Sequence, residues 1–381
     1  MRIAIVNNEF GMGGLQRVTT VIGKALSQNH EVFFYSLNKT QNFYEIDKNF
    51  VEGESLLFKN PFLKKIWKSR RLLEQIKKRG EYTPYKYVRP NLDKLIEFSS
   101  DNKLDCLILS GHDATAYIPY LKKKLLPSIK LIAWQHNNLD MYINSYAKSF
   151  KSAYLDGLSK ADCIVCLTNS DFNIYKKYNS SITRIYNPLT IENTDQISNL
   201  NNKVISFVGR LAMEHKGIDY LIEIASKLPD DWKISIAGSG DDSTMKQINK
   251  LMKKYDVKNK VVFCGALKSD GLTKHYLNSS IYIMTSRWEG FGLVLAEAMS
   301  FGLPIISFEN TGSNEVLSQG KYGKLVENGN VEKIIDELIL FIENEKLRFE
   351  YQKKSLERVK DFYIERIISD WEKVLLEVQD E

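Results

Sequence analysis

Two glutamates eight positions apart, Glu289 and Glu297, are the residues whose setting points most directly to chemistry. Glu289 precedes the turn Gly290-Phe291-Gly292, and Glu297 lies about one turn into the helical pattern that begins at Leu293. The neighbours of Glu297 are almost all apolar, and a carboxylate in such surroundings normally needs hydrogen-bond donors. Sugar hydroxyls are suitable donors, and the free N–H groups of a helix start can receive sugar or phosphate oxygens. A glutamate on a polar helix face, the alternative, fits this composition poorly.

Two cations six positions apart, Arg210 and Lys216, follow a strand pattern that ends in Gly209. Arginine offers a bidentate fork and lysine a point charge, and both kinds of group suit a diphosphate. The alternative interpretation is a pair of solvated surface cations.

A glycine-rich turn, residues 11–17, follows the first strand pattern of the chain. Glycines let the backbone approach a ligand closely, and the start of the next helix favours an anion. The turn is not the dinucleotide fingerprint, because Gln16 stands where the third glycine would fall. Phosphate contact and a purely geometric role both stay open for it.

Alternating strand and helix patterns must position these residues. In the first half, a helical pattern at residues 15–27 lies between two strand patterns, which is a βαβ opening and implies a parallel sheet. The expected strands of this half are residues 2–6, 31–37, 105–109, 130–134 and 163–167. The second half repeats the pattern, with strands at 204–208, 233–237, 261–264, 281–285 and 304–307, and helices at 217–227, 243–255, 293–300 and 331–343. Ligands of such sheets bind at the carboxyl ends of the strands.

The length of 381 residues favours two domains, because a single core stops growing at smaller sizes. Residues 187–203 are polar and open with Asn187-Pro188, a composition typical of a linker. Cys163 and Cys166 lie in an apolar run, so a buried strand explains them better than metal or redox chemistry. With no secretory signal and no apolar run near the ~18–20 residues of a membrane span, we expect a cytoplasmic protein.

Together, these segments resemble the retaining nucleotide-sugar glycosyltransferases of family 4, and the Glu-x7-Glu element around Gly-Phe-Gly is the most specific part of the likeness. The resemblance implies the α/β fold called GT-B, in which two doubly wound, Rossmann-like domains face a central cleft. Residues 1–187 would bind the acceptor and residues 188–361 the nucleotide-sugar donor. Residues 362–381 would form a helix that packs back on the first domain.

The resemblance also implies roles for individual residues. Glu289 would contact the donor sugar, Glu297 the ribose, and Arg210 with Lys216 the diphosphate. Backbone groups after Gly238 and around Leu267 would complete the site, the latter reading the base, commonly uracil. The implied donor-binding residues are Gly14, Gly209, Arg210, Lys216, Gly238, Leu267, Glu289, Gly290, Phe291, Gly292, Leu293 and Glu297.

His136 matches a family histidine that faces the reacting sugar, although a histidine among polar neighbours is more often a loop residue. With Arg210, Lys216 and Glu289 it makes up the implied catalytic set, and His112 is a weaker candidate. One departure is the segment from Thr311 to Glu315, where many family members have Gly-Gly-x-x-Glu and this chain keeps one of the two glycines.

The mechanism implied is transfer with retention, in which Arg210 and Lys216 stabilise the leaving diphosphate. We expect neither a metal ion nor a cofactor besides the donor, because no D-x-D element and no metal-ligand spacing is present. The expected donor is a UDP-sugar carrying a hexose or N-acetylhexosamine, with GDP left open. Rival interpretations are an epimerase or phosphorylase on the same fold, or a non-catalytic partner subunit that binds nucleotide sugar.

The acceptor side is basic: residues 1–190 carry a net charge of +11 and the remainder −5. Residues 59–94 hold 12 Lys/Arg against three acids, with aromatic residues between them. Such a segment can lie on an anionic membrane, grip a polyanionic acceptor such as a teichoic acid, or be a solvated helix. Nucleic acid is not expected, because no recognition motif accompanies the charge. We favour a peripheral enzyme at the inner face of the cell membrane that adds sugar to a glycan, lipid-linked or glycopolymer acceptor.

Overall fold

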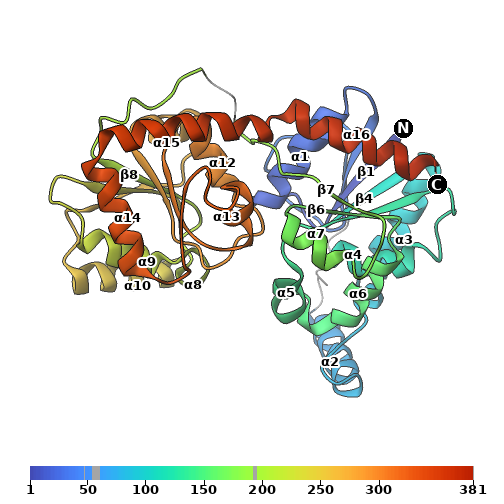
Figure 1. Cartoon of the computed structure of the whole chain (residues 1–381). Coiled ribbons are helices and arrows are strands. Elements are labelled where there is room, and N and C mark those ends of the chain that lie inside the picture. The colour runs from blue at the N-terminus through green and yellow to red at the C-terminus, as the bar shows by residue number, and fades with distance from the viewer. Residues whose placement is uncertain (47, 54–60, 192–194, 381) are drawn as a thin grey trace. The chain divides into compact units, whose positions relative to one another are not determined.

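The computed structural model describes residues 1–46, 48–53, 61–191 and 195–380. The chain forms two compact units, Met1–Pro188 with Ile364–Glu381, and Leu189–Tyr363. Each unit is a parallel sheet with helices on both faces (Figure 1). The predicted fold class, two doubly wound α/β domains, is confirmed at the level of each unit.

The N-terminal unit contains a seven-stranded sheet in the order β3-β2-β1-β4-β5-β6-β7. Residues 3–6 of β1 are completely buried, and β1 pairs in parallel with β2 on one side and β4 on the other. Continuous apolar strands of this kind are typical of sheets covered on both faces. The strands are β1 Arg2–Asn7, β2 Glu31–Ser36, β3 Phe50–Glu52, β4 Cys106–Ser110, β5 Lys130–Trp134, β6 Cys163–Cys166 and β7 Ile182–Arg184.

Helices of this unit connect the strands in βαβ order, and the last one comes from the C-terminus of the chain. They are α1 Gly14–Leu26, α2 Pro61–Lys77, α3 Tyr85–Asp101, α4 Gly111–Leu121, α5 Leu139–Met141, α6 Lys151–Lys160, α7 Asn169–Tyr175 and α16 Ile364–Asp380, with a π-helical turn Tyr142–Tyr146 and a 3-10 turn Lys148–Phe150. Helix α16 packs on α1. Its Trp371 meets Trp134 edge-on with ring centroids 4.7 Å apart, and its Glu372 accepts from His30 at 2.7 Å.

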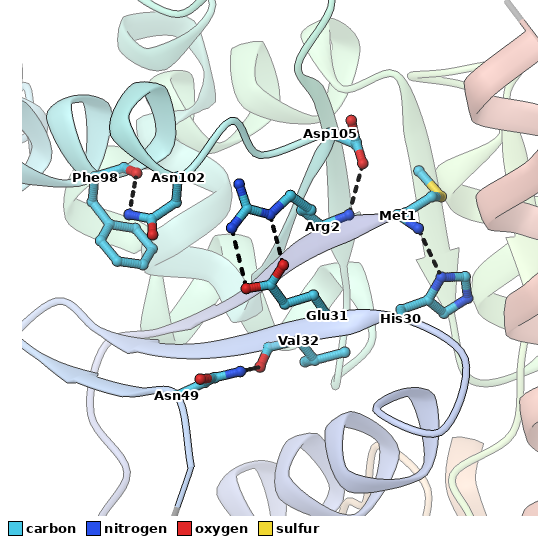
Figure 2. A network of polar contacts seen from close by, with 9 residues as sticks. All are labelled: Met1, Arg2, His30, Glu31, Val32, Asn49, Phe98, Asn102 and Asp105. Carbon is cyan, nitrogen blue, oxygen red and sulfur yellow. Dashed lines mark hydrogen bonds and ion pairs between the residues drawn. The ribbon is translucent and has the colours of Figure 1, made fainter.

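Polar contacts hold the amino ends of the strands in this unit (Figure 2). The Arg2 guanidinium donates to both carboxylate oxygens of Glu31, at 2.7 and 3.1 Å, across the β1–β2 pair. The backbone N–H of Arg2 donates to Asp105 at 2.7 Å, just before β4. These bonds lie at the opposite end of the sheet from the carboxyl edge, where ligands of such folds bind.

The C-terminal unit contains a six-stranded sheet in the order β10-β9-β8-β11-β12-β13. Its strands are β8 Val204–Val208, β9 Lys233–Ala237, β10 Val261–Gly265, β11 Ile281–Met284, β12 Ile305–Phe308 and β13 Lys324–Val326. Its helices are α8 Met213–Lys216, α9 Ile218–Ser226, α10 Asp242–Tyr255, α11 Ser269–Leu277, α12 Leu293–Ser300, α13 Thr311–Val316, α14 Val331–Glu343 and α15 Glu345–Arg358, followed by the 3-10 turn Val359–Phe362.

The strand order reverses at β8, which pairs with β9 on one side and β11 on the other. The chain leaves β8 toward β9 and β10 and returns to pair β11 with β8. The connections that follow β8 and β11 therefore start from adjacent strands and lead to opposite sides of the sheet. This topological switch point is where doubly wound sheets bind their ligands.

The stretch predicted as a linker, 187–203, is partly packed. Ser198 and Leu200 are buried, the Ser198 hydroxyl donates to the carbonyl of Ser279 at 2.5 Å, and Gln352 donates to the carbonyl of Ser198 at 2.7 Å. Ser198, in the second half of this stretch, is therefore bound inside the C-terminal unit. Among the described residues, no helix is long and apolar enough to span a bilayer.

Candidate active site

The loops after β8 and β11 are bound directly to each other. The Thr285 hydroxyl donates to the carbonyl of Lys216 at 2.8 Å, and the backbone N–H of Arg287 donates to the carbonyl of His215 at 2.9 Å. Gly217, with φ of +60°, separates α8 from α9, and a Cβ there would lie 2.1 Å from the carbonyl oxygen of Thr285. The close approach of the two loops therefore depends on this glycine.

Arg287 braces the same junction with its side chain. The guanidinium donates to the carbonyls of Met213 and Glu214 at 3.1 and 3.0 Å and to the Asp219 carboxylate at 3.0 and 2.6 Å. It also stacks over Tyr220, 4.0 Å from the ring centroid. Arg287 thus fixes α8, the element that carries Lys216, against the end of β11.

Lys216 and Glu289 meet as an ion pair between these loops. Their side chains are only 14% and 11% exposed. Burial alone would raise the pKa of Glu289, but the charges of Lys216 and His215 and the hydrogen bond from Lys216 bring that pKa below its usual value. The buried carboxylate is therefore ionised at neutral pH, and its charge is balanced by the lysine.

His215 lies beside this pair with its ring stacked on Trp288, 4.8 Å between centroids and 13° between planes. Its Nε2 lies 3.0 Å from the carbonyl oxygen of Trp288. Burial lowers the pKa of His215 and outweighs the opposing charge of Glu289. Arg210 is exposed on the same loop and adds a second positive charge near His215.

Glu297 lies on α12 and is 1% exposed. Its two oxygens accept hydrogen bonds from the hydroxyls of Thr190 and Tyr276, each at 3.1 Å. The sequence predicted that this carboxylate needs donors, and protein hydroxyls supply them in the structure. Contact with a ribose stays a prediction, which would require these hydroxyls to share the carboxylate.

Helix α12 begins at Leu293 after Gly292, whose φ is +86°, and no side chain caps it. Its start is therefore open to an oxygen ligand. The preceding turn, with Gly290 and Phe291 buried, is clamped by α13: the backbone N–H of Gly312 donates to the carbonyl of Glu289 at 3.1 Å, and a Cβ at Gly312 would lie 2.6 Å from the carbonyl oxygen of Phe291.

The turn that the sequence left uncertain, before Glu315, is well defined. Asn310 and Ser313 form a reciprocal capping box at the start of α13. The glycine that this chain retains, Gly312, is the one that the close contact with Phe291 requires, while Thr311 occupies the position of the other.

The loops after β8, β9 and β10 are bound side by side through Gly209 and Gly238. The backbone N–H of Gly209 donates to Ala237 at 3.0 Å, and that of Gly238 donates to Gly265 at 2.8 Å. A Cβ on Gly238 would lie 1.9 Å from the carbonyl oxygen of Gly209. Leu267 follows β10, half-buried beside Gly271.

The N-terminal unit holds the other predicted site residues. Gly14 is the exposed first residue of α1, and the Tyr44 hydroxyl bonds both the N–H and the carbonyl of Gly13, at 3.2 and 2.8 Å. His136 directly follows β5 and Gln135, with its ring 4.6 Å from that of Trp134. Its backbone N–H donates to the Tyr142 hydroxyl at 3.1 Å.

The His136 side chain is held neutral. Its Nε2 is buried and has no hydrogen-bond partner within the described part of the chain. Burial lowers the pKa of His136 to about 3. His112, the weaker candidate, packs among aromatic rings, with Phe150 stacked at 6.0 Å, and burial lowers its pKa as well.

Comparison with known proteins relates this chain to glycosyltransferases. Residues 190–358 match the family model described as glycosyl transferases group 1. A glycosyltransferase of Haemophilus influenzae, itself uncharacterised, is 29% identical over 95% of this chain and 96% of its own length. This chain is a glycosyltransferase, and its residues 190–358 carry the group 1 match. A further relative is the N-acetylgalactosamine-N,N'-diacetylbacillosaminyl-diphospho-undecaprenol 4-alpha-N-acetylgalactosaminyltransferase of Campylobacter jejuni, 26% identical over 98% of this chain and 99% of its own.

The fold of the glycosyltransferase is GT-B. HepE of Anabaena, solved in complex with UDP-glucose, superposes with a TM-score of 0.75 at 17% identity, covering 99% of this chain and 100% of its own. The loops that carry Arg210, Lys216 and Glu289 all lie inside the stretch matched by the family model, whereas Gly14 and His136 lie outside it.

Four residues of this candidate site received no role from sequence reasoning. Arg287 and His215 support the Lys216–Glu289 pair, and Thr190 and Tyr276 bind Glu297. Arg287 is two positions before Glu289, and His215 is next to Lys216, so their places in the sequence could have indicated a role in the site. Thr190 and Tyr276 carry none, because their contacts with Glu297 span 107 and 21 positions.

Proposed function

We propose that this glycosyltransferase moves a hexose or N-acetylhexosamine from a UDP-sugar to a glycan acceptor, with retention and without a metal ion. The observation that carries the proposal is the buried Lys216–Glu289 pair at the switch point of the C-terminal sheet. A carboxylate accepts hydrogen bonds from sugar hydroxyls, and a neighbouring lysine attracts a diphosphate.

In the proposed mechanism, Arg210 and Lys216 stabilise the negative charge that grows on the diphosphate as it leaves. Glu289 holds hydroxyls of the donor sugar while Lys216 turns from it toward the phosphates. The acceptor hydroxyl attacks from the face of the leaving group, and a phosphate oxygen takes its proton. His136, neutral because of its lowered pKa, offers the sugar a hydrogen bond without adding charge.

The donor and acceptor classes are supported by what relatives bind. UDP-glucose occupies the solved structure of HepE, which supports a uridine donor here. The name of the Campylobacter relative gives a saccharide on diphospho-undecaprenol as its acceptor. We therefore propose a lipid-linked glycan in cell-surface glycopolymer synthesis, met at the inner face of the membrane through the basic segment 59–94.

The test is a transfer assay with labelled UDP-sugars, using Arg210→Ala and Glu289→Ala. Arg210→Ala should lower kcat by about 10²-fold or more, the usual effect of removing a group that stabilises charge in the transition state. Glu289→Ala should remove most of the transfer activity, because the donor sugar would lose the carboxylate that holds its hydroxyls. Exposed residues of the same unit provide matched controls, Lys353→Ala and Glu343→Ala, which should leave turnover unchanged.

The same assay separates the rivals by product. An epimerised nucleotide sugar, or a sugar phosphate formed from a glycan, would assign a different reaction to the fold. Wild-type turnover by either site variant at saturating donor and acceptor would overturn the roles given to Arg210 and Glu289. Lack of any donor turnover in the absence of a second protein would support a non-catalytic partner.

A further inference from the structure

Along one side, helix α2 contacts the rest of the N-terminal unit. The Glu74 carboxylate accepts from the hydroxyls of Thr83 and Tyr87 at 2.8 and 2.9 Å, which binds the helix to α3 and to the segment just before it. The Trp67 ring meets that of Tyr87 at 5.4 Å, and the Arg71 guanidinium lies 3.8 Å from the centroid of Tyr82. This side of α2 therefore packs against the rest of the N-terminal unit.

The opposite side of α2 exposes a compact apolar patch. Leu72, Leu73 and Ile76 are 59%, 57% and 69% exposed. Ile76 lies four positions after Leu72 and three after Leu73, and residues at these spacings are neighbours on a helix surface, so the three side chains form one patch around Ile76. Three adjacent large apolar side chains this exposed are unusual on a surface that water alone contacts. Figure 1 shows that α2 stands out from the body of its unit.

Cations surround this patch. The exposed residues Lys65, Lys68, Arg70, Lys77 and Arg79 lie on and beside the same helix. The one acid among residues 65–79 is Glu74, which faces α3 and is paired with Lys78 and Lys86 at 3.2 and 3.1 Å. The outer side of α2 thus presents apolar side chains and positive charge with no acid among them.

We propose that the outer face of α2 docks this enzyme on a bilayer that carries anionic lipid. The cations contact lipid phosphates, and Leu72, Leu73 and Ile76 enter the interface between headgroups and acyl chains. A polyanionic polymer would satisfy the cations and leave the apolar patch in water. A bilayer with anionic lipid satisfies both the cations and the apolar patch.

The purpose of docking rests on the proposed function, because a lipid-linked acceptor is reached only at the membrane. The face itself contains none of the residues assigned to the donor. Membrane binding and sugar transfer can therefore be measured separately.

The experiment is co-sedimentation of the full chain with vesicles of phosphatidylcholine, with and without phosphatidylglycerol. We expect binding to the anionic vesicles that weakens as salt rises. The triple variant Leu72→Ser, Leu73→Ser, Ile76→Ser should partition at least about tenfold more weakly. A control triple variant at other exposed leucines, Leu126→Ser, Leu340→Ser, Leu376→Ser, should bind as the wild type does.

Three results would overturn the docking site. They are no binding to anionic vesicles, equal binding by the α2 variant, and equal loss in the control triple variant. The wild type and both triple variants could also bind soluble polyglycerol phosphate while none of them binds vesicles. That result would assign the cations to a polyanionic acceptor instead. The α2 variant should transfer sugar to a water-soluble acceptor as fast as the wild type does. If the wild type itself transfers no sugar, the proposed function is contradicted. The vesicle experiment then still decides whether α2 docks on a membrane.

Discussion

At the scale of single residues, Gly238 sits where two loops of the site touch. A Cβ there would lie 1.9 Å from the backbone oxygen of Gly209, and backbone cannot move aside as a flexible side chain can. We expect Gly238→Ala to destabilise the chain by roughly 1–3 kcal/mol, the usual cost of overpacking, and to weaken donor use by displacing the loop of Arg210. Urea unfolding and KM for the donor measure the two effects.

Gly271 provides the control. Its Cβ would meet Leu267 at 3.5 Å, an ordinary contact, and Gly271 lies within α11. Gly271→Ala should be neutral or slightly stabilising, because alanine favours a helix over glycine. If both substitutions cost the same, the close approach at Gly238 has no energetic weight.

His136 predicts a pH dependence of stability. Its pKa is about 3 in the folded chain and near 6.5 when unfolded. Below about pH 6.5, His136 binds a proton in the unfolded chain but not in the folded chain. The free energy of unfolding therefore decreases as the pH falls, by up to about 1.4 kcal/mol per pH unit. His136→Gln should flatten that slope by up to this amount between pH 6 and 4. Urea unfolding at several pH values measures it, and an unchanged slope would contradict the buried neutral imidazole.

The chemistry of the site residues was readable from their types, but their partners were not. Glu289 and Lys216 were each predicted to bind a different part of the donor. Their ion pair could not be foreseen, because the two residues are 73 positions apart and meet only through the strand order β8-β11. The hydroxyls that bind Glu297 were hidden for the same reason.

At the scale of elements, α16 is held to the N-terminal unit by Trp371, which is fully buried against Trp134. Trp371→Ala should cost about 3–5 kcal/mol, as large-to-small substitutions of buried tryptophan do. Leu376, 60% exposed on the same helix, is the matched site, and Leu376→Ala should change stability by less than about 0.5 kcal/mol. Equal effects on the urea midpoint would show that α16 is not anchored as described.

The elements themselves were predictable where their patterns were long. Every predicted strand appears within about two residues of its expected bounds, because buried parallel strands are continuous apolar runs. The edge strands β3, β7 and β13 have three residues each, too few for a pattern. Helix α15 was missed because its buried side carries polar residues, including Arg348, Gln352, Ser355 and Arg358.

At the scale of the whole molecule, two units with separate cores divide at Pro188–Leu189 and Tyr363–Ile364. The C-terminal unit contains Arg210, Lys216, Glu289 and Glu297, and the basic residues of α2 and the neutral His136 belong to the other. The central claim is that the C-terminal unit binds the donor, because the roles proposed for Arg210, Lys216 and Glu289 all depend on it.

Thermal unfolding of the full chain with a panel of UDP- and GDP-sugars tests that claim most directly. A ligand that binds only the folded state stabilises it by about 2.7 kcal/mol at a hundredfold excess over Kd. We expect a uridine nucleotide sugar to raise Tm, and Arg210→Ala or Lys216→Ala to remove the shift while Lys353→Ala keeps it. No shift with any nucleotide sugar, or an undiminished shift in both site variants, would contradict the account.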